Sequence, residues 1–417
     1  MSTEPSSIII IGGGHAAAQL CASLAEAGLG PRVQLVCAEA HLPYQRPPLS
    51  KAFLKNSAEA LQAHRADAWY DTAGITVHRN DPAVVIDRAA RQVQLQSGKR
   101  LDYGQLVLAT GTRARRLAGW PAELANVAVL RNAADALRLR PLLNDAKSLT
   151  VLGGGFIGLE VAATARALGA AVQVIEVAPR LLGRSVSAEL SAHVLATHQA
   201  AGIEVLLGAQ LGGIEHDGQR LQALTVNGQR QPVDLLLLGI GAEPELGLAQ
   251  AAGLACGNGI IVDAAMRSSD PLILAIGDLA NFPVDPRWAP GGQRLRLESV
   301  QNANDQARCA ALTLQGQAPV YAALPWFWSE QGAMRLQMAG LMPAAGTPGT
   351  PEIRQYRRPG ANPGSFSILH YLGDQLLCVE SANAPMDHVM SRKLMEAGKH
   401  PPPEVFSDPA VALKTLL

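Results

Sequence analysis

Two glycine-rich segments are the part of this chain best suited to chemistry. Both follow one pattern: a glycine, any residue, a second glycine, two further residues and a small residue. In such a loop the first glycine allows a tight turn, the second lets the backbone approach a pyrophosphate, and the last position lets a helix pack closely on a strand. The segments are Gly12-Gly13-Gly14-His15-Ala16-Ala17 and Gly153-Gly154-Gly155-Phe156-Ile157-Gly158. Two such segments predict two bound dinucleotides, and therefore redox chemistry.

Each glycine segment lies between an apolar run and an amphipathic run. Residues 8–11 are four isoleucines and predict a buried parallel strand, because they leave no polar face, and residues 149–152 repeat this strand. Helices are expected over residues 16–27 and 156–168, each directing unpaired N–H groups and about half a positive charge at a phosphate. This order of strand, glycines and helix argues against the alternative of two flexible loops.

An acidic residue follows the next apolar run in each copy. Glu39 comes after residues 33–36, and Glu176 comes after residues 172–175. In dinucleotide-binding folds an acid at this place accepts hydrogen bonds from the adenosine ribose. We therefore expect both acids to contact a nucleotide.

The charge and length of the chain bound its class. The 417 residues predict two or three domains. Lysine plus arginine equals aspartate plus glutamate, at 35 each, so the composition gives no sign of nucleic acid or an anionic membrane as a partner. No apolar run reaches the roughly 18 residues that span a bilayer, and no basic region precedes the first apolar stretch. We expect a cytoplasmic protein that binds neither membrane nor nucleic acid.

The cysteines and histidines show no spacing typical of a metal or dithiol site. The five cysteines are far apart in sequence: Cys21, Cys37, Cys256, Cys309 and Cys378. A redox-active dithiol normally shows a close pair, so thioredoxin-reductase and glutathione-reductase chemistry is disfavoured. No metal site is predicted, and the lack of clustered thiols excludes an iron–sulfur cluster in this chain. A single peroxidatic thiol at Cys37 stays open.

The order of elements predicts one nucleotide domain interrupted by another. Residues 101–111 and residues 233–241 each contain an acid, a buried strand and a turn of small residues, and they form an internal repeat. Residues 272–276 predict a further strand that delivers Asp278 after a glycine. From about Tyr321 onward, short strands and turns indicate a third, α+β domain, in which the proline- and glycine-rich residues 343–364 are expected to be loop.

The chain resembles the putidaredoxin-reductase type of FAD-dependent NADH:ferredoxin reductase over nearly its whole length. The segments that carry this resemblance are His41-Leu42-Pro43-Tyr44-Gln45-Arg46-Pro47-Pro48-Leu49-Ser50-Lys51, the second glycine segment with Leu159-Glu160-Val161-Ala162, Glu298-Ser299-Val300-Gln301-Asn302-Ala303, and Pro325-Trp326-Phe327-Trp328-Ser329. In the first of these, two prolines stiffen the loop, and Ser50 is expected to cap a helix that Lys51 begins.

The resemblance implies an α/β fold with two Rossmann-like domains, the second inserted in the first. An FAD-binding domain would comprise residues 1–113 and 243–320, an NAD-binding domain residues 114–242, and a C-terminal α+β domain residues 321–417. The implied activity passes a hydride from NADH to FAD and then single electrons to a [2Fe-2S] ferredoxin, which supplies a cytochrome P450 or a ring-hydroxylating oxygenase. The ferredoxin would dock transiently and electrostatically, with candidate contacts Arg294, Arg296, Arg308 and Arg335.

The resemblance also carries site residues over, position by position. It gives catalytic roles to Lys51 and Glu160, as a pair near the hydride-transfer position, and to Trp328, as an aromatic beside the flavin. The implied FAD contacts are Gly12, Gly14, His15, Ala16, Glu39, Arg46, Lys51, Ala83, Ala109, Thr110, Gly111, Arg131, Gly277, Asp278, Ser299, Val300 and Trp328. The implied NAD contacts are Gly153, Gly155, Phe156, Ile157, Gly158, Glu160, Glu176, Arg184 and Gly241.

Glu176 also predicts which nicotinamide cofactor is used. At about 4 Å from a 2′-phosphate, its carboxylate would be repelled by roughly 4 kcal/mol at an effective dielectric near 20. This energy corresponds to on the order of a thousandfold preference for NADH over NADPH. Arg180 and Arg184 would weaken the preference if they reached the phosphate.

Two other classes of flavoprotein stay open. One is an NADH oxidase or peroxidase, which would need a cysteine at the flavin. The other is a redox-sensing, NADH-binding flavoprotein similar to apoptosis-inducing factor. Steady-state NADH consumption with a dye, and then with a ferredoxin, separates the three.

Overall fold

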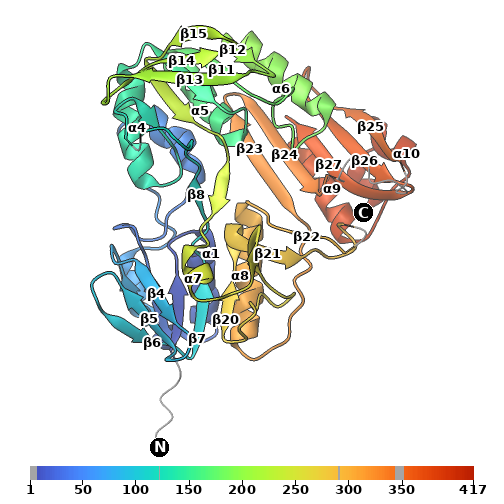
Figure 1. Ribbon diagram of the computed structural model, residues 1–417. Helices are drawn as coiled ribbons and strands as arrows, with labels where there is room; N and C mark the ends of the chain where they lie inside the picture. The colour runs from blue at the N-terminus through green and yellow to red at the C-terminus, as the bar shows by residue number, and fades with distance from the viewer. Residues whose placement is uncertain (1–6, 122, 290–291, 343–351) are drawn as a thin grey trace, which may run out of the picture. The chain divides into compact units, whose positions relative to one another are not determined.

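The computed structural model describes residues 7–121, 123–289, 292–342 and 352–417. Figure 1 shows the chain coloured from its N-terminus to its C-terminus. The chain divides into two compact units. The first contains Met1–Gln45, Leu61–Arg113 and Glu243–Pro325, and the second contains Arg46–Ala60, Ala114–Ala242 and Trp326–Leu417. Each unit therefore carries one of the two glycine segments.

The first unit is built on a five-stranded parallel sheet in the order β20-β7-β1-β2-β3. Its strands are β1 (Ile8–Ile11), β2 (Val33–Val36), β3 (Thr76–His78), β7 (Gln105–Leu108) and β20 (Ile273–Ala275). The central strand β1 is buried on both faces, as four consecutive isoleucines require. The helices α1 (His15–Glu26) and α8 (Val300–Leu314) pack against each other. This unit has the Rossmann-like sheet that the first glycine segment predicts.

The rest of the first unit consists of smaller elements. An antiparallel sheet contains β4 (Ala83–Asp87), β5 (Gln92–Leu95) and β6 (Arg100–Asp102). A second small sheet contains β18 (Cys256–Gly257), β19 (Gly259–Ile261), β21 (Ala280–Pro283) and β22 (Arg294–Leu295). The short helices are α3 (Asp67–Thr72) and α7 (Gly247–Ala251). The strands β8 (Thr112–Ala114) and β17 (Ala242–Pro244) lie where the chain leaves and re-enters this unit.

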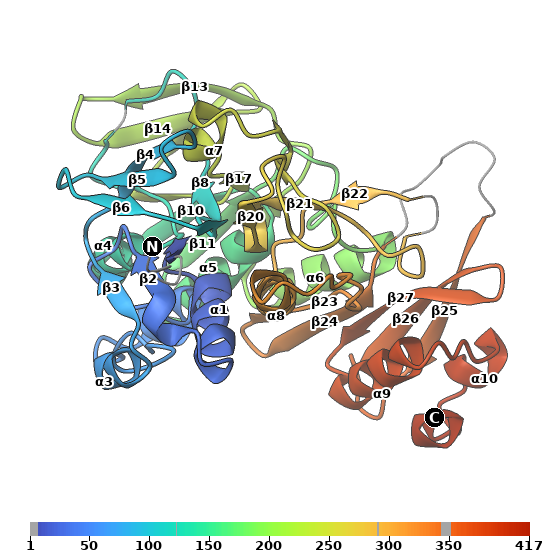
Figure 2. The same cartoon turned by 90° about the horizontal axis from the view of Figure 1, so that it is seen from below.

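The second unit repeats the parallel sheet, in the order β12-β11-β10-β16-β9. Its strands are β9 (Val127–Ala128), β10 (Ser148–Leu152), β11 (Ala171–Ile175), β12 (Ile203–Leu206) and β16 (Leu235–Leu238). Its helices are α4 (Ala133–Asp145), α5 (Phe156–Ala167) and α6 (Ala188–Ala200). An antiparallel sheet of β13 (Leu211–His216), β14 (Leu221–Val226) and β15 (Gln229–Pro232) belongs to the same unit, and Figure 2 shows β13 and β14 side by side.

The second unit also contains an antiparallel C-terminal sheet, in the order β23-β24-β27-β26-β25. Its strands are β23 (Trp326–Gln331), β24 (Met334–Gly340), β25 (Ile353–Pro359), β26 (Phe366–Leu372) and β27 (Gln375–Ala382). The helices α9 (Pro385–Glu396) and α10 (Pro403–Ser407) follow, and earlier in sequence a 3-10 helix (Pro47–Ser50) and α2 (Ala52–Lys55) join this unit. The predicted α/β fold with a C-terminal α+β part is confirmed.

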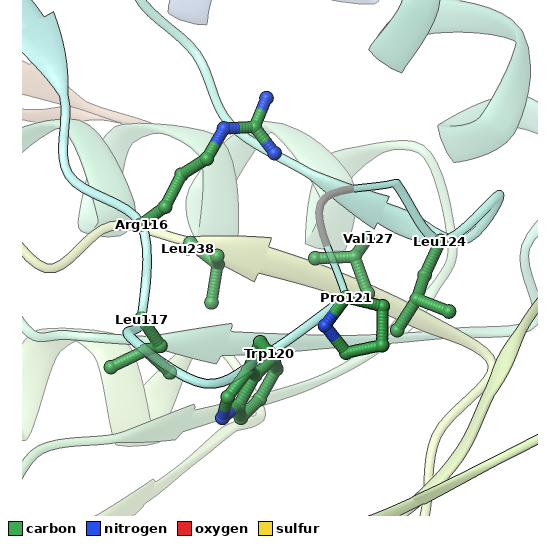
Figure 3. Close-up of a pocket in the computed structure, with 7 residues that line it drawn as sticks. All are labelled: Arg116, Leu117, Trp120, Pro121, Leu124, Val127 and Leu238. Atoms are coloured by element: carbon green, nitrogen blue, oxygen red, sulfur yellow. The ribbon is translucent and has the colours of Figure 1, made fainter. Parts of the chain in front are cut away.

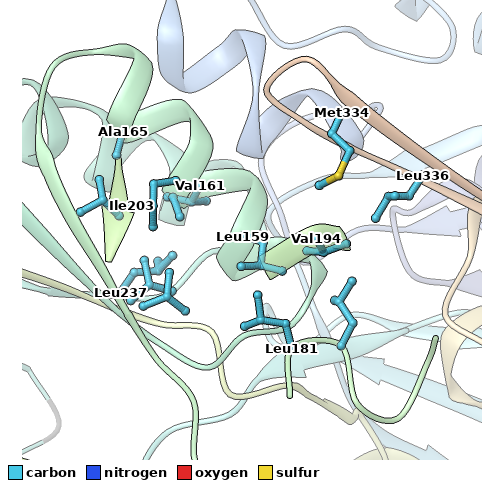
Figure 4. Close-up of a cluster of buried hydrophobic side chains, with 14 of the residues drawn as sticks. Leu159, Val161, Ala165, Leu181, Val194, Ile203, Leu237, Met334 and Leu336 are labelled. Atoms are coloured by element: carbon cyan, nitrogen blue, oxygen red, sulfur yellow. The ribbon is translucent and has the colours of Figure 1, made fainter. Parts of the chain in front are cut away.

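One hydrophobic core joins the second parallel sheet to the C-terminal sheet. Leu159 and Val161 of α5 lie in the same buried cluster as Val194 of α6 and Met334 and Leu336 of β24 (Figure 4). All of these side chains are at most 2% exposed. The helix that follows the second glycine segment is therefore held from both sides, by its own parallel sheet and by the C-terminal sheet.

Two expectations about local structure are wrong. The loop expected over residues 343–364 includes strand β25, which pairs along its length with β26, whereas residues 343–351 lie outside the described residues. Ser50 does not cap the helix that follows it: the residue before α2 is Lys51, and it provides no side-chain cap. Among the described residues, no helix combines the length and the apolar character that a membrane span requires.

Candidate functional site

The first glycine turn is fixed by close contact between backbones. Gly12 has φ +133°, and a Cβ there would lie 2.2 Å from the carbonyl oxygen of Ala109 at the end of β7. Gly277, at φ +79°, packs against the first turn of α1, since an added Cβ would lie 3.2 Å from the Cβ of Ala16. The turn that carries Asp278 is thereby brought next to the start of α1. The structure thus gathers three separate predicted FAD-binding segments in the first unit.

The second glycine turn repeats this geometry. Gly153 has φ +107°, and an added Cβ would lie 2.5 Å from the carbonyl oxygen of Gly239 at the end of β16. At the third position of the motif, a Cβ on Gly158 would lie 2.5 Å from the carbonyl oxygen of Gly153. Gly153 is therefore required by the close approach of the turn to the end of β16, and Gly158 by the packing of α5 against the turn.

The helices after the two glycine turns begin without a side-chain cap. The N-cap residues of α1 and α5 are Gly14 and Gly155, and neither can supply a capping oxygen. Among the other long helices, α4, α6 and α8 are capped by the side chains of Asn132, Ser187 and Ser299, whereas α9 begins at a proline without a side-chain cap. A Cβ on Gly155 would meet nothing nearer than 3.8 Å. N–H groups without a side-chain cap at the start of both helices fit the phosphates of a dinucleotide.

The two acids after the glycine turns are held in different ways. The Glu176 carboxylate accepts hydrogen bonds from the backbone N–H groups of Gly154 and Ala178, both at 2.7 Å. The Glu39 carboxylate accepts one from the Tyr44 hydroxyl at 2.6 Å. Glu176 is therefore oriented by the glycine turn itself.

The two arginines near Glu176 differ in what they contact. The Arg180 guanidinium donates hydrogen bonds to the carbonyl oxygens of Gly183, Val186 and Ser187 within its own loop. Arg184 is exposed, and its guanidinium would lie 3.9 Å from a Cβ built on Gly241. Arg184 thus lies beside the end of β16, whereas the Arg180 guanidinium is hydrogen-bonded to carbonyls of the loop that contains both arginines.

Lys51 and Glu160 form an ion pair of 2.7 Å inside the second unit. Glu160 lies in α5 and is 4% exposed, whereas Lys51 is 22% exposed. The same carboxylate accepts hydrogen bonds from the hydroxyls of Ser50 at 2.5 Å and Ser329 at 2.7 Å. The Ser50 backbone is tied to α5 as well, because the Thr164 hydroxyl donates to its carbonyl oxygen. A carboxylate buried to this extent is stabilised by these three donors.

Arg46 and Arg131, both predicted to contact FAD phosphates, lie together. The Arg46 guanidinium donates a hydrogen bond of 2.9 Å to the backbone carbonyl of Arg131, whose own N–H donates to the Asp135 carboxylate. This arrangement places two arginines at the N-terminus of α4. Their proximity favours an anionic ligand there.

Side chains alternate between the two faces of strand β23, so Trp328 lies on the face opposite to the Lys51–Glu160 pair. Phe327 and Ser329 point toward α5, where the Phe327 ring lies 4.6 Å from that of Phe156. Trp328 shares the other face of the strand with Trp326, with ring centroids 5.6 Å apart. The structure therefore brings Phe156 to β23 but does not bring Trp328 to Glu160. Trp328 is only partly buried.

The other predicted FAD contacts lie at ends of elements in the first unit. Ala83 begins β4, Val300 begins α8 after the cap at Ser299, and His15 begins α1. Thr110 donates from its hydroxyl to the carbonyl of Glu245. Ends of this kind leave backbone groups available to a ligand.

Sequence reasoning missed the roles of Ser50 and Ser329 as donors to Glu160. Ser50 is 110 residues from Glu160 in sequence, and Ser329 is 169 residues away. Both serines belong to segments that carry the family resemblance, which is the one signal that marks them. Local pattern could not have shown that they converge on one carboxylate.

The cysteines do not provide a reactive thiolate. All five are free thiols, and four are buried. Burial raises the pKa of Cys37 to about 12 and that of Cys309 to about 11, and it raises the pKa of the other three as well. A peroxidatic cysteine requires a lowered pKa, so this geometry argues against that role for Cys37.

A pocket in the second unit lies outside the predicted site (Figure 3). It is lined by Arg116, Leu117, Trp120, Pro121, Leu124, Val127 and Leu238. Most of these residues belong to, or pack against, the hydrophobic cluster under β13 and β14. None of them is a predicted contact of FAD or NAD.

Comparison with known proteins covers nearly the whole chain. Residues 6–307 match the family model of pyridine nucleotide-disulphide oxidoreductases, and residues 326–417 match the reductase C-terminal model. Rhodocoxin reductase of Rhodococcus erythropolis is 40% identical, over 98% of this chain and 93% of that protein. Putidaredoxin reductase of Pseudomonas putida is 37% identical, over 98% of this chain and 96% of that protein.

Solved structures give the same result. The ferredoxin reductase for the CYP199A2 system of Rhodopseudomonas palustris superposes with a TM-score of 0.90 at 41% identity, covering 98% of this chain and 99% of that one. The reductase in the covalent putidaredoxin reductase–putidaredoxin complex superposes with a TM-score of 0.90 at 35% identity, covering 99% and 98%. The chain therefore belongs to the pyridine nucleotide-disulphide oxidoreductase family, among the reductases that resemble putidaredoxin reductase.

Proposed function

We propose that this protein is an FAD-dependent NADH:ferredoxin reductase that supplies electrons to a cytochrome P450 or a ring-hydroxylating oxygenase. The observation that carries the proposal is the pair of uncapped helix N-termini behind glycine turns, in a chain that is similar over nearly its whole length to a putidaredoxin reductase. When bound, FAD accepts a hydride from NADH and releases electrons singly, which suits a [2Fe-2S] ferredoxin.

We assign FAD binding to residues 1–113 and 243–320, and NAD binding to residues 114–242. In the first unit the FAD contacts are the turn and helix residues gathered near Gly12, together with Glu39 and Ala83. In the second unit Arg46, Lys51, Arg131 and Trp328 are assigned to FAD, and the second glycine turn with Arg184 and Gly241 is assigned to NAD. We assign the cytoplasm as the location.

The chain's own contribution to hydride transfer is orientation and charge. Lys51 carries a positive charge beside the Glu160 carboxylate, which is buried and accepts three hydrogen bonds. A pair held in this way fixes one charged arrangement and excludes water from the carboxylate. We therefore assign the pair to the position where the nicotinamide meets the flavin.

We assign NADH as the hydride donor. Glu176 is locked by two backbone N–H groups, so its carboxylate cannot turn away from an approaching phosphate without losing both bonds. The donors of Arg180 are committed to loop carbonyls, which leaves Arg184 as the nearby cation. The repulsion estimated from the sequence therefore applies with little compensation.

Ferredoxin docking is assigned to a transient electrostatic encounter. The four arginines proposed for it are already engaged: Arg296 pairs with Glu298 at 2.6 Å, Arg308 with Asp305 at 2.5 Å, and Arg335 with Glu330 at 3.9 Å. Arg294 donates to two backbone carbonyls. Three of these four charges are therefore offset by a carboxylate, and docking should depend only modestly on salt.

The test uses the purified protein. Its visible spectrum should show bound flavin, which NADH bleaches under anaerobic conditions, and reduction of a dye and then of a [2Fe-2S] ferredoxin should follow. A protein that stays colourless after incubation with FAD contradicts the proposal. Peroxide formed in proportion to the NADH consumed would instead identify an oxidase.

A further inference from the structure

A buried line of hydrogen bonds leads away from Glu160 on the side opposite Lys51. The Ser329 hydroxyl bonds to Glu160 Oε1 at 2.7 Å, the Gln331 side-chain amide bonds to Ser329 Oγ at 3.2 Å, and Gln331 Oε1 lies 2.8 Å from His198 Nε2. The three residues come from β23 and α6, and each is at most 3% exposed. Water therefore does not take the place of any of these bonds.

The chemistry of the groups fixes the direction of every bond in this line. A carboxylate only accepts, so Ser329 must donate to Glu160 and must in turn accept from Gln331. The Gln331 NH₂ group then faces Ser329, which turns its oxygen toward His198. An amide oxygen only accepts, so His198 must carry its hydrogen on Nε2. The charge on Glu160 thus determines the tautomer of a histidine three hydrogen bonds away.

We propose that Ser329, Gln331 and His198 are positioning residues, which hold Glu160 as an oriented carboxylate beside Lys51 through a one-directional chain of hydrogen bonds. Burial lowers the pKa of His198, so the imidazole takes part as a neutral donor. This line of hydrogen bonds provides Glu160 with a donor, the Ser329 hydroxyl, at Oε1, while Ser50 and Lys51 donate to Oε2. Both carboxylate oxygens are then occupied, and the carboxylate plane is fixed.

The elements that carry these hydrogen-bonded residues are packed together, which preserves the geometry of the line of hydrogen bonds. His198 lies on α6 and Glu160 on α5, and both helices contribute to the core shared with β24 (Figure 4). Strand β23 is anchored to α5 by Phe327 and Phe156. The three elements therefore cannot shift independently, and the polar line has one geometry.

The first test reads the tautomer of His198 in holoenzyme labelled with ¹⁵N at histidine. The wild-type spectrum should show His198 as the neutral Nε2–H tautomer, and the His198→Gln variant identifies this signal by removing it. Glu160→Gln supplies an amide that can donate to Ser329, so the direction is no longer imposed and the His198 signal should shift or split. Glu189→Gln, on the same helix as His198, is the control and should leave the signal unchanged.

Two outcomes of this experiment overturn the inference. One is an Nδ1–H tautomer of His198 in the wild type. The other is a His198 signal that does not respond to Glu160→Gln. Neither depends on enzymatic turnover, so the result stands whether or not NADH reduces the flavin.

The second test concerns catalysis and rests on the proposed function. Ser329→Ala should lower the limiting rate of flavin reduction by NADH about tenfold, as loss of one hydrogen bond to a charged group predicts, with NADH affinity unchanged. Ser191→Ala is the matched control, because the hydroxyl of this buried serine of α6 donates to the Leu181 carbonyl and makes no recorded bond to Glu160, Gln331 or His198 in the described structure. His198→Gln should retain the rate, since its amide can donate to Gln331, whereas His198→Leu should lose it.

Equal rates for Ser329→Ala and Ser191→Ala would overturn the positioning role. A wild-type protein that NADH cannot reduce would instead contradict the proposed function, and the histidine spectrum would still decide the inference. The two failures are therefore distinguishable.

Discussion

The two glycine turns have the same backbone conformation but differ in the residues that surround them. Gly12 and Gly153 both have positive φ and press against the carbonyl at the end of a neighbouring strand. At the third position of the motif the first turn has Ala17, fully buried, whereas Gly158 of the second could not carry a Cβ. The turn therefore dictates the first glycine, whereas the closeness of helix and strand dictates the third residue.

The acids that follow the turns differ more. Glu176 is bonded to the backbone of its own glycine turn, whereas Glu39 is bonded to a tyrosine side chain. A carboxylate held by the backbone has less freedom to adapt to a different ligand. We therefore expect the second turn to discriminate between nucleotides more strongly than the first.

Substituting the first glycine of each turn should affect a different cofactor at each turn. Gly12→Ala forces a Cβ against Ala109, so we expect the purified protein to lose FAD. Gly153→Ala should retain FAD, but reduction by NADH should fall by about a hundredfold or more, because the nicotinamide would be misplaced. Flavin absorbance and rapid-mixing kinetics measure the two effects.

The helix-ending glycines provide matched controls for both turns. Gly28 and Gly169 also have positive φ, but an added Cβ would meet nothing within 4 Å. Alanine there should lower stability by roughly 1–2 kcal/mol and leave both cofactors in place. If Gly12→Ala kept FAD while Gly153→Ala lost it, the two assignments would have to be exchanged.

Removing Lys51 tests whether its ion pair with Glu160 contributes to hydride transfer. Lys51→Met should retain FAD but reduce the rate of hydride transfer by on the order of a hundredfold, because Glu160 loses its charged partner. Lys55→Met, on the exposed side of the adjoining helix α2, should behave as the wild type. An unchanged rate for Lys51→Met would remove the pair from the mechanism.

Substituting Glu39 and Glu176 tests which of the two acids discriminates between NADH and NADPH. In the wild type, kcat/KM for NADH should exceed that for NADPH by about a thousandfold. Glu176→Ala should reduce this ratio at least tenfold, and Glu39→Ala should leave it unchanged. Comparable use of NADPH by the wild type would show that Arg184 outweighs Glu176.

The smallest effect is expected outside both turns, at the ferredoxin. Turnover with ferredoxin should fall on the order of threefold when salt is raised from about 0.05 M to about 0.3 M, whereas dye reduction should not change. The effect is small because three of the four candidate arginines are already paired with carboxylates. A salt response of either zero or a hundredfold would require a different docking surface.

The sequence predicted the parallel sheets well and the surroundings of Glu160 poorly. Strands β1, β2, β10 and β11 lie within one residue of the apolar runs from which they were predicted, because buried parallel strands are rich in apolar residues. The hydrogen bonds to Glu160 join residues more than a hundred positions apart, and no local pattern reports such distances. Only the family resemblance pointed to Lys51.

The two wrong expectations have physical reasons. Strand β25 is an edge strand rich in arginine and glutamine, and its mostly exposed residues give no apolar alternation. Ser50 was expected to cap a helix because serine is common there. Its hydroxyl instead binds the distant Glu160 carboxylate, a stronger acceptor that becomes available only in the folded chain.

The core shared by α5, α6 and β24 limits how this reductase can be recombined with its relatives. A graft that exchanged only residues 326–417 would set foreign side chains against Leu159, Val161 and Val194, and the mismatch would fall on the helix that carries Glu160. Chimeras intended to change the redox partner should therefore take α5, α6 and the C-terminal sheet from the same protein.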